Sequence, residues 1–279
     1  MFKILTTLIF LGALSPSVFA ADLTVSYQIK EGKKKGERTV YWSDKFNLTK
    51  DSLSKVDTLY DYDAGMMYTI DHREKKIETF NFKDMGGMMG DAQQMMGEMM
   101  GRKAPRGDKT IGQSMEESTA KYFGDPGKVV LQKLGTLTVA GRSCDNYKVE
   151  RKGGKIETSQ EVCVDPTLSP PQNPNAEVAQ MHQAAEAMSG TLGNLQSPAE
   201  RELANLKGTP LRRINNSKTK GMMFGGGNIQ MEEEATLVQV GPIDPAVFRL
   251  PSGYKQIDQA QMMRDQMQEM QKMMGETGK

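Results

Sequence analysis

The sequence contains few of the residues that usually carry chemistry. It has two histidines, His72 and His182, and neither is accompanied by a serine or cysteine in a nucleophile motif. Its two cysteines do not form a Cys-x-x-Cys redox motif, and no histidine lies near them to complete a zinc site. The segment "GDPGK" lacks the length and the final hydroxyl of a phosphate-binding loop. We therefore expect a protein that is not an enzyme and that holds no cofactor or metal.

The chain also lacks net charge and long apolar runs. It has 36 basic and 35 acidic residues, so the positive excess expected of a nucleic-acid-binding protein is missing. After residue 20, no run approaches the roughly 20 apolar residues that a membrane-spanning helix needs. Hydrophobic residues make up only 37% of the chain, which predicts that part of it lies outside any packed core.

The N-terminal segment "MFKILTTLIFLGALSPSVFA" has the pattern of a secretory signal peptide. Lys3 supplies a positive charge, an apolar run follows, and Val18 and Ala20 place small residues where a signal peptidase reads. We expect cleavage between Ala20 and Ala21. No cysteine follows this site, which argues against a lipid anchor. The expected location of the mature chain is a bacterial periplasm.

Alternating apolar and polar residues predict a mainly β protein. In "DLTVSYQIK", Leu23, Val25, Tyr27 and Ile29 share one face, which is typical of a half-buried strand. Similar runs recur at about ten places, with the spacing of an all-β sheet or barrel. The other runs are "ERTVYWS", "VDTLYDYD", "MMYTID", "KIETFNF", "KVVLQKLGTLTV", "CDNYKVER", "KIETSQEVCVD", "PLRRINNSK" and "NIQMEEEATLVQV".

Helical patterns interrupt these strands. Residues 176–188 carry an apolar face, and "SPAERELANLKG" has the start and stop signals of a helix. Ser197 is the expected N-cap, Pro198 the first helical residue, Glu200 the partner in a capping box, and Gly208 the stop. The predicted fold is therefore mainly β (α+β): a curved antiparallel sheet of about ten strands with inserted and C-terminal helices.

The two cysteines are predicted to face each other in a hairpin. Gly153 and Gly154 lie between two strand-like runs and form a natural two-residue loop. With that loop Cys144 lies directly opposite Cys163, at a spacing that a disulfide accepts. Because the chain is expected to be exported, we predict a structural disulfide. The same register places Tyr147, Val149, Ile156 and Val162 together on the other face of the hairpin.

Four motifs, in this order, carry a family resemblance. They are "AGRSCDNYKVE", "EVCVD", "GTPLRR" and "DPAVFRLPSGYKQI", and they follow a strand pair after the signal peptide. The order resembles an uncharacterised group of exported domains related to the LolA-like periplasmic lipoprotein carriers, and the resemblance covers most of Leu23 to Ile257. The chain departs from that group in two inserts, 84–101 and 175–208, and none of its residues maps one to one onto a carrier residue.

The resemblance implies a half-barrel of antiparallel strands whose concave side is closed by helices over an apolar cavity. In well-studied relatives this cavity holds acyl chains. Together with the alternation of the strands, it predicts an apolar concave surface. The candidate residues of that surface are Leu23, Val25, Tyr27, Ile29, Tyr147, Val149 and Val162.

Methionines concentrate in two segments. "DMGGMMGDAQQMMGEMMG", residues 84–101, holds seven methionines and five glycines. On a helical wheel its methionines occupy one sector, apart from the glycines and the polar residues. They are Met85, Met88, Met89, Met95, Met96, Met99 and Met100. The C-terminal segment repeats the pattern with Met262, Met263, Met267, Met270, Met273 and Met274. Each segment therefore predicts a helix with a flexible thioether face.

Three interpretations of these faces stay open. They pack on the sheet or on each other, or they form an adaptable lid over a lipid, a peptide or a partner protein. The third interpretation is a Cu(I) site, since clustered thioethers favour that ion. A helical arc spreads the sulfur atoms along a ridge, however, and no histidine or cysteine lies among them.

The sequence thus predicts a signal peptide (1–20), a LolA-like half-barrel domain (21–257) and a methionine-rich C-terminal helix (258–279). The expected function is that of an exported, non-enzymatic binding module. It would hold an apolar ligand, such as a lipid, an acyl chain or a hydrophobic peptide, under Met85, Met88, Met89, Met95, Met96, Met99, Met100, Met263, Met267, Met270 and Met274. The alternatives are a periplasmic Cu(I) binder and an envelope module that contacts a protein partner or the membrane surface.

Overall fold

The structure is a computed structural model that describes the strand-forming part of the chain. The described residues are 21–81, 129–152, 155–171, 198–219, 227–259 and 261–262, with isolated residues 101, 110, 113–114, 117–118 and 121. The expected signal peptide, the methionine-rich insert 84–101 and the predicted helix at 176–188 lie outside them, apart from Gly101. The predictions for these segments stay predictions.

One sheet contains all twelve strands of the described residues. The strands are β1 (Leu23–Glu31), β2 (Lys34–Trp42), β3 (Phe46–Asp51), β4 (Val56–Asp61), β5 (Met66–Asp71), β6 (Lys76–Asn81), β7 (Leu131–Val139), β8 (Arg142–Arg151), β9 (Ile156–Asp165), β10 (Thr209–Thr219), β11 (Asn228–Val240) and β12 (Lys255–Asp258). Their order across the sheet is β12-β6-β5-β4-β3-β2-β1-β11-β10-β9-β8-β7. The sheet is therefore open, with β12 and β7 as its edges.

The prediction of a mainly β protein with a curved sheet is confirmed, the predicted number of strands was wrong, and of the predicted helices the described residues contain only one short helix. Alternation identified ten strands and missed β3 and β12. β3 is a six-residue strand that separates two stronger patterns, and it is recognisable mainly by its pairing with β2 and β4. β12 has only four residues and pairs with β6 in the one parallel ladder of the described sheet. The formation of both strands therefore depends more on pairing with neighbouring strands than on the pattern of their own residues.

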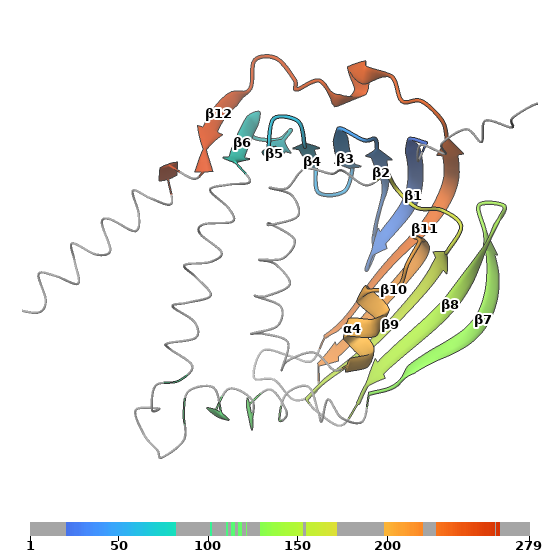
Figure 1. Cartoon of the computed structure of the whole chain (residues 1–279). Coiled ribbons are helices and arrows are strands. Elements are labelled where there is room, and N and C mark those ends of the chain that lie inside the picture. The colour runs from blue at the N-terminus through green and yellow to red at the C-terminus, as the bar shows by residue number, and fades with distance from the viewer. Residues whose placement is uncertain are drawn as a thin grey trace, which may run out of the picture.

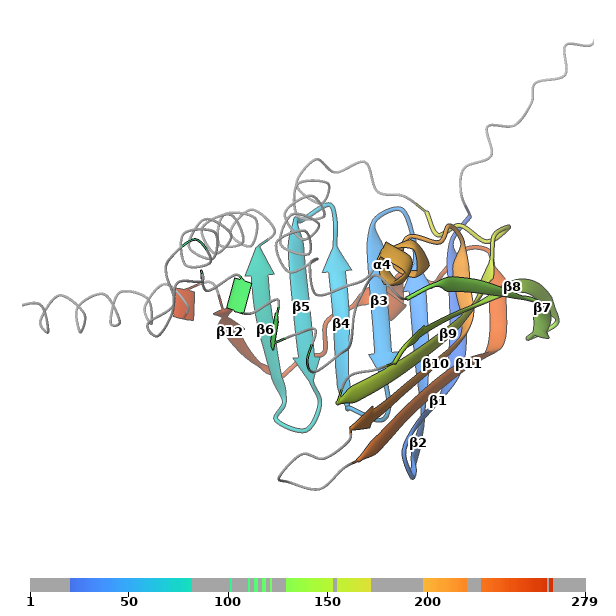
Figure 2. The same cartoon turned by 90° about the horizontal axis from the view of Figure 1, so that it is seen from below.

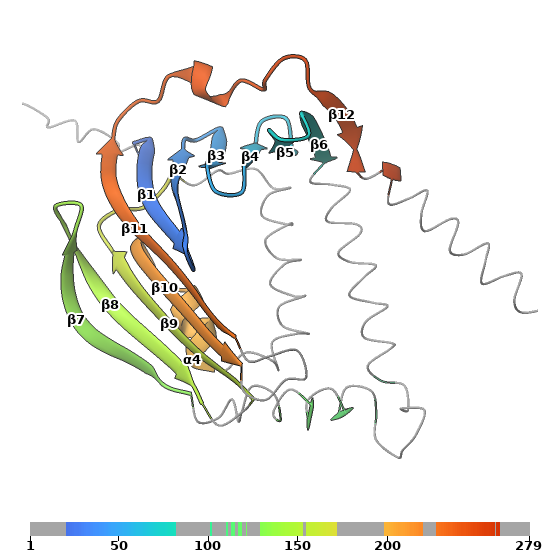
Figure 3. The same ribbon diagram turned by 180° about the vertical axis from the view of Figure 1, so that it is seen from behind.

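The sheet curves strongly, so that its two faces differ (Figure 1). Strands β2 to β6 form the first arm of the curved sheet, and strands β7 to β11 form the second arm. Figures 2 and 3 show both arms from below and from behind. We call the face that carries Tyr27 and Val40 the inner face. The opposite, outer face of β3 to β5 is covered by residues 241–254, which connect β11 to β12 along the outside of the curve.

The predicted burial of one face of β1 is confirmed. Leu23, Val25, Tyr27 and Ile29 are all 5% exposed or less. They form the main hydrophobic core with residues of β2, β8, β9, β10 and β11, including Val40. The period-two alternation read from the sequence therefore identified the central strand correctly.

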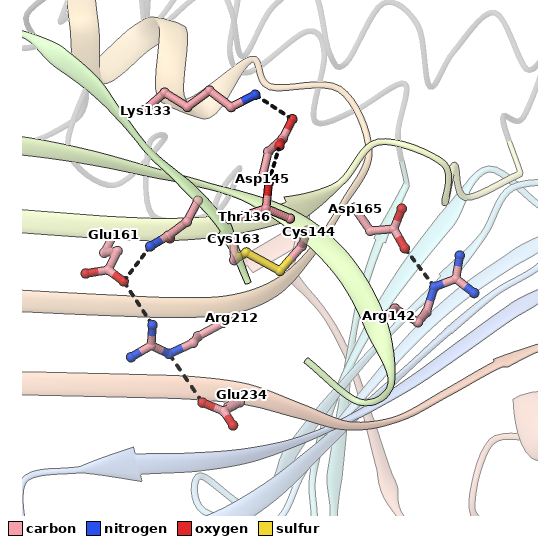
Figure 4. The surroundings of a disulfide bond; sticks show 11 residues. Lys133, Thr136, Arg142, Cys144, Asp145, Glu161, Cys163, Asp165, Arg212 and Glu234 are labelled. Atoms are coloured by element: carbon pink, nitrogen blue, oxygen red, sulfur yellow. Dashed lines mark hydrogen bonds and ion pairs between the residues drawn. A yellow bond between two sulfur atoms is a disulfide. The ribbon is translucent and has the colours of Figure 1, made fainter. Parts of the chain in front are cut away.

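The predicted disulfide is confirmed, while the predicted register of its hairpin was wrong. Cys144 and Cys163 are bonded, with their Cα atoms 5.4 Å apart, and both side chains are buried in the main core (Figure 4). The residue opposite Cys163 is Asn146, so Cys144 lies one diagonal step away and not directly across. The connection between β8 and β9 is longer than two residues, because the last paired residues are Arg151 and Thr158. A shift of two residues leaves every side chain on its predicted face, since strand side chains alternate with period two.

A short helix lies against the inner face of the second arm. This helix, α4 (Pro198–Ala204), begins at Pro198 as predicted. Its residues Ala199 and Leu203 pack with Val149 in a second hydrophobic cluster. The helix ends at Ala204, before Gly208. Gly208 has a φ of +114°, and a Cβ added to it would lie 2.3 Å from the backbone carbonyl oxygen of Asp165. Glycine is therefore required here by the close approach of two backbone segments, and not by the end of the helix.

Candidate ligand-binding groove

The inner face of the sheet contains a groove of about 610 Å³. Strands β1 to β4 form its floor, and the start of β10 and the middle of β11 border it. Its lining residues are Tyr27, Arg38, Val40, Trp42, Asn47, Thr49, Asp51, Ser54, Val56, Thr58, Pro210, Arg213 and Glu233. Most come from the alternate positions of neighbouring strands that share one face.

The strand register arranges the floor of the groove in rows. One row runs from Val40 across Thr49 to Thr58, and a second pairs Trp42 with Asn47. These rows combine aliphatic, aromatic and hydroxyl groups on one surface. Such a surface suits a ligand that is largely apolar and makes a few hydrogen bonds.

The remaining row carries charge. Arg38 on β2 donates from Nε and Nη2 to Oδ2 of Asp51, at 3.1 and 2.7 Å, and from Nη1 to Oε1 of Glu233, at 2.9 Å. Arg213 on β10 lies 3.5 Å from the second oxygen of Glu233. The Glu233 side chain is only 9% exposed, and these two arginines offset the cost of burying its carboxylate. One guanidinium thus joins β2, β3 and β11.

The electrostatics of this row are consistent with fixed ion pairs. Burial by itself would raise the pKa of Asp51, but the backbone N–H of Ser54, the Arg38 guanidinium and the N–H of Leu53 outweigh it, so the pKa lies below its ordinary value. Burial would lower the pKa of Arg38, and its two carboxylate partners outweigh that effect and raise it. Both groups are therefore charged at neutral pH.

Tyr27 closes the groove at the boundary with β10. Its hydroxyl donates a hydrogen bond to the carbonyl oxygen of Pro210 at 2.9 Å. Burial, with the nearby Glu233 carboxylate, raises the pKa of this hydroxyl, so that it stays a neutral donor. The hydrogen bond joins the central strand to the start of the second arm.

The charges of the groove balance one another. Two arginines, Arg38 and Arg213, contact two carboxylates, Asp51 and Glu233, through three ion pairs. A floor with two positive and two negative groups has no net charge to select a charged ligand. Val40 and Trp42, in the uncharged rows next to it, then offer the surface on which an apolar ligand would gain most.

The residues predicted for the cavity wall belong to two separate clusters. Of the β1 residues, Tyr27 lines the groove, whereas Leu23 and Val25 are packed in the main core. Tyr147 and Val162 face each other on the hairpin, and they pack with Val149 under α4 in the second cluster. Ile29 lies beside two smaller hollows at the far end of β1.

The methionines predicted to form a lid lie outside the described residues. These are Met85, Met88, Met89, Met95, Met96, Met99, Met100, Met263, Met267, Met270 and Met274. Met262 is described, and its side chain is 44% exposed. The lid, packing and Cu(I) interpretations therefore stay predictions.

Sequence reasoning did not identify the charged residues of the groove. Arg38 lies between strand residues whose alternation was recognised, on the same face as Val40 and Trp42. A charged residue on the apolar face of a strand signals a buried ion pair or a site. Its partner Glu233 lies 195 residues away, and no local pattern connects the two.

His72, one of the two histidines, lies on the outer face and not in the groove. Its Nε2 contacts Oδ2 of Asp57 at 2.9 Å, and its Nδ1 contacts the hydroxyl of Tyr254 at 2.9 Å. It therefore links β4 to the covering segment 241–254. Within the described ranges, no group of three or more histidine, cysteine or acidic residues is placed to hold a metal ion. The described part of the chain also has no helix with the length and apolar character needed to cross a membrane.

Comparisons with known proteins give a likeness in structure only. No family model and no curated protein matches the sequence. Among solved structures, the chain is similar to an uncharacterized conserved protein from Thermus thermophilus. The identity is 8% and the TM-score 0.39, over 86% of this chain and 91% of that one.

The chain is also similar to MucB, which has been solved in complex with MucA from Pseudomonas aeruginosa. The identity is 8% and the TM-score 0.37, over 86% of this chain and 59% of the matched chain. A structure of MucB alone gives 9% identity and a TM-score of 0.35. The chain thus spans about three fifths of the matched MucB chain. With TM-scores below 0.5, these likenesses decide neither the family nor the function of this chain.

Proposed function

We propose that this chain is an exported, non-enzymatic binding module whose inner groove holds the apolar part of a ligand, such as an acyl chain or a hydrophobic peptide. The observation that carries the proposal is the groove itself. Its volume of about 610 Å³ falls within the roughly 300–1,000 Å³ typical of small-molecule sites. Val40, Trp42 and Val56 give it apolar walls.

The chemistry of the groove favours binding over catalysis. Both acidic side chains that border it are engaged by arginines, so neither is poised as a general acid or base. The neutral charge balance favours an uncharged or apolar group at this position. Export is supported by the signal-peptide pattern and by the Cys144–Cys163 disulfide, which suits an oxidising compartment.

The single tryptophan of the chain gives a direct test, because Trp42 lines the groove. Bromine quenches tryptophan emission only at close range, so 9,10-dibromostearic acid should quench Trp42 and unbrominated stearic acid should not. We expect saturable quenching of more than about half of the emission when the mature chain is titrated. An apolar occupant of this groove must lie within contact of that ring.

Two variants localise the effect. Thr49→Phe places a bulky ring in the middle of the floor and should weaken binding about tenfold or more, a loss of roughly 1.4 kcal/mol. Gln28→Phe, at an exposed position on the other face of β1, serves as the matched control and should bind normally. Unquenched Trp42 at saturating dibromostearate, or equal affinity of Thr49→Phe and the parent, would refute the proposal.

A further inference from the structure

The strand β7 forms an open edge of the sheet. It pairs with β8 on one side and is the last strand in the sheet order. Figures 1 and 3 show it at the outer margin of the second arm, with no described strand beyond it. Within the described chain, no backbone hydrogen bond is made to its other edge. A strand in this position presents N–H and C=O groups that can pair with another chain.

β7 lacks most of the features that usually protect an edge. Seven consecutive residues, from Gln132 to Thr138, are exposed, and none of them is a proline. Lys133 is the only charged residue of the strand, and its ion pair with Asp145, at 3.0 Å, balances its charge. Natural edge strands are commonly guarded by several lysines, by prolines or by shortness. This edge is nine residues long and electrically neutral.

Apolar side chains accompany the open edge. Leu134 is 50% exposed and Leu137 is 36% exposed, and Val130, just before the strand, is 62% exposed. Leu134 is the extra residue of a bulge between Lys133 and Gly135, where the register with β8 shifts. The edge therefore offers a stretch from Gly135 to Thr138 whose register with β8 is unbroken, with one exposed leucine, Leu134, just before it and another, Leu137, within it.

The exposed edge of β7 is also held in place by the strands on its paired side. Leu137 lies opposite Cys144 in the β7–β8 ladder, and Cys144 is cross-linked to β9. Val139, at the end of the strand, is buried in the main core. A template that is already ordered loses little conformational entropy on binding, which lowers the cost of adding a strand.

We propose that β7 is a docking site for a short, extended, uncharged segment of a partner protein, which binds by strand addition. The backbone of the segment would pair with Gly135–Thr138, and its alternate apolar side chains would pack on Leu134 and Leu137. The site lies on the edge of the second arm, whereas the groove lies on β1 to β4, so it is independent of the proposed ligand site.

A second copy of this chain fits the edge less well than a short segment. Stable dimers bury roughly 1,200–2,000 Å² and use about 20–30 residues a side. A nine-residue edge supplies fewer than half of these residues. A short segment needs only the regular stretch beside the bulge.

The test uses a fluorescent seven-residue peptide of alternating threonine and valine and the mature chain. We expect saturable binding by fluorescence polarisation, together with slower hydrogen exchange confined to residues 131–139. The same peptide with every backbone nitrogen methylated cannot form the ladder by either of its edges and should not bind. Leu137→Lys introduces a natural edge guard and should weaken binding at least about fivefold.

Leu237→Lys is the matched control, because Leu237 is 51% exposed but lies on the interior strand β11. This variant should bind the peptide like the parent. Three results would overturn the proposal. They are no binding at millimolar peptide, equal binding by Leu137→Lys and the parent, and a concentration-dependent dimer of the parent that Leu137→Lys abolishes. The last result would make a second copy the occupant.

Discussion

At the residue scale, one carboxylate organises the polar end of the groove. Oδ1 of Asp51 accepts the backbone N–H groups of Leu53 and Ser54, which closes the turn after β3. Its Oδ2 accepts Nε and Nη2 of Arg38 and so orients the guanidinium toward Glu233. A single side chain thus serves both the local turn and a contact between distant strands. Its ionisation should therefore be visible in the stability of the whole sheet.

The ionisation of Asp51 leads to a pH-dependent prediction. Since its folded pKa is lower than its ordinary value of 3.8, its ionised form stabilises the fold above about pH 4, and this contribution is lost as the pH falls through the folded pKa. Asp51→Asn should lower the free energy of unfolding by about 2 kcal/mol at pH 7, because it removes charge-assisted hydrogen bonds. The gap to the parent should narrow toward about pH 2.

Urea unfolding followed by Trp42 emission at pH 7 and at acid pH measures this gap. Asp63→Asn is the control, because Asp63 is 61% exposed and its ion pair with Lys45 lies on the surface. The control should change the free energy of unfolding by less than about 0.5 kcal/mol at either pH. A loss in Asp51→Asn that is the same at both values of pH would contradict the prediction.

At the scale of elements, the β8–β9 hairpin joins the core to the exposed edge. Its outer face carries Asn146, whose Nδ2 donates to Glu161 at 3.0 Å. Arg212 of β10 donates to the same carboxylate at 2.9 Å (Figure 4). Its inner face carries Val149 under α4. The disulfide cross-links the two strands of the hairpin on the face that carries Asn146, so the position of β7 depends on it.

Removal of the disulfide should therefore destabilise the second arm. The bond joins residues 19 apart, and the chain-entropy model gives about 3 kcal/mol for a loop of this size. The double variant Cys144→Ala/Cys163→Ala should lose about that free energy of unfolding, and exchange of the β7 and β8 amides should accelerate. Chemical denaturation and hydrogen exchange without reductant measure both effects.

Reductant provides the internal control for this prediction. It should destabilise the parent and leave the double variant unchanged. Peptide mapping of the parent without reductant should find Cys144 linked to Cys163. Two free thiols in freshly isolated protein, or a parent whose stability is indifferent to reductant, would contradict the disulfide as a stabilising element.

At the scale of the whole molecule, the segment 241–254 ties the centre of the sheet to its far edge. It leaves β11, crosses the outer face, and delivers β12 to β6 (Figure 1). Phe248, in the 3₁₀ helix η3 (Pro245–Phe248), is its main anchor. This ring is 8% exposed, packs on Leu48 and Leu59, and stacks on Phe46 with ring centres 4.8 Å apart. The segment is therefore the hydrophobic cover of the first arm.

Loss of that anchor should loosen the first arm. Phe248→Ala should lower the free energy of unfolding by about 3–4 kcal/mol, because it removes a buried ring and leaves a cavity. Hydrogen exchange of β12 and β6 should accelerate before that of β8 and β9. Phe248→Leu keeps most of the apolar contact and should cost clearly less, about 1 kcal/mol. Equal stability of Phe248→Ala and the parent would show that the segment is not an anchor.

Much of the local structure could be predicted from the sequence, because its causes are local. Alternation predicts that Leu23, Val25, Tyr27 and Ile29 share one buried face. This prediction does not depend on which strands lie beside β1. Pro198 marks the start of α4 for a reason internal to the segment, its fixed φ and missing N–H. The pairing of the two cysteines follows from their place in one hairpin, and an error of two residues in register left it intact.

Local sequence pattern is therefore enough to predict which residues form most of the strands, which face of β1 is buried, and which cysteines are joined. The strand order, the short strands β3 and β12, and the contact between Arg38 and Glu233 in the groove depend instead on the folded sheet. The physical reason is the range of the interactions. Side-chain alternation and turn geometry act over a few residues, whereas the pairing of β1 with β11 depends on the free energy of burying a whole sheet face, to which every strand contributes.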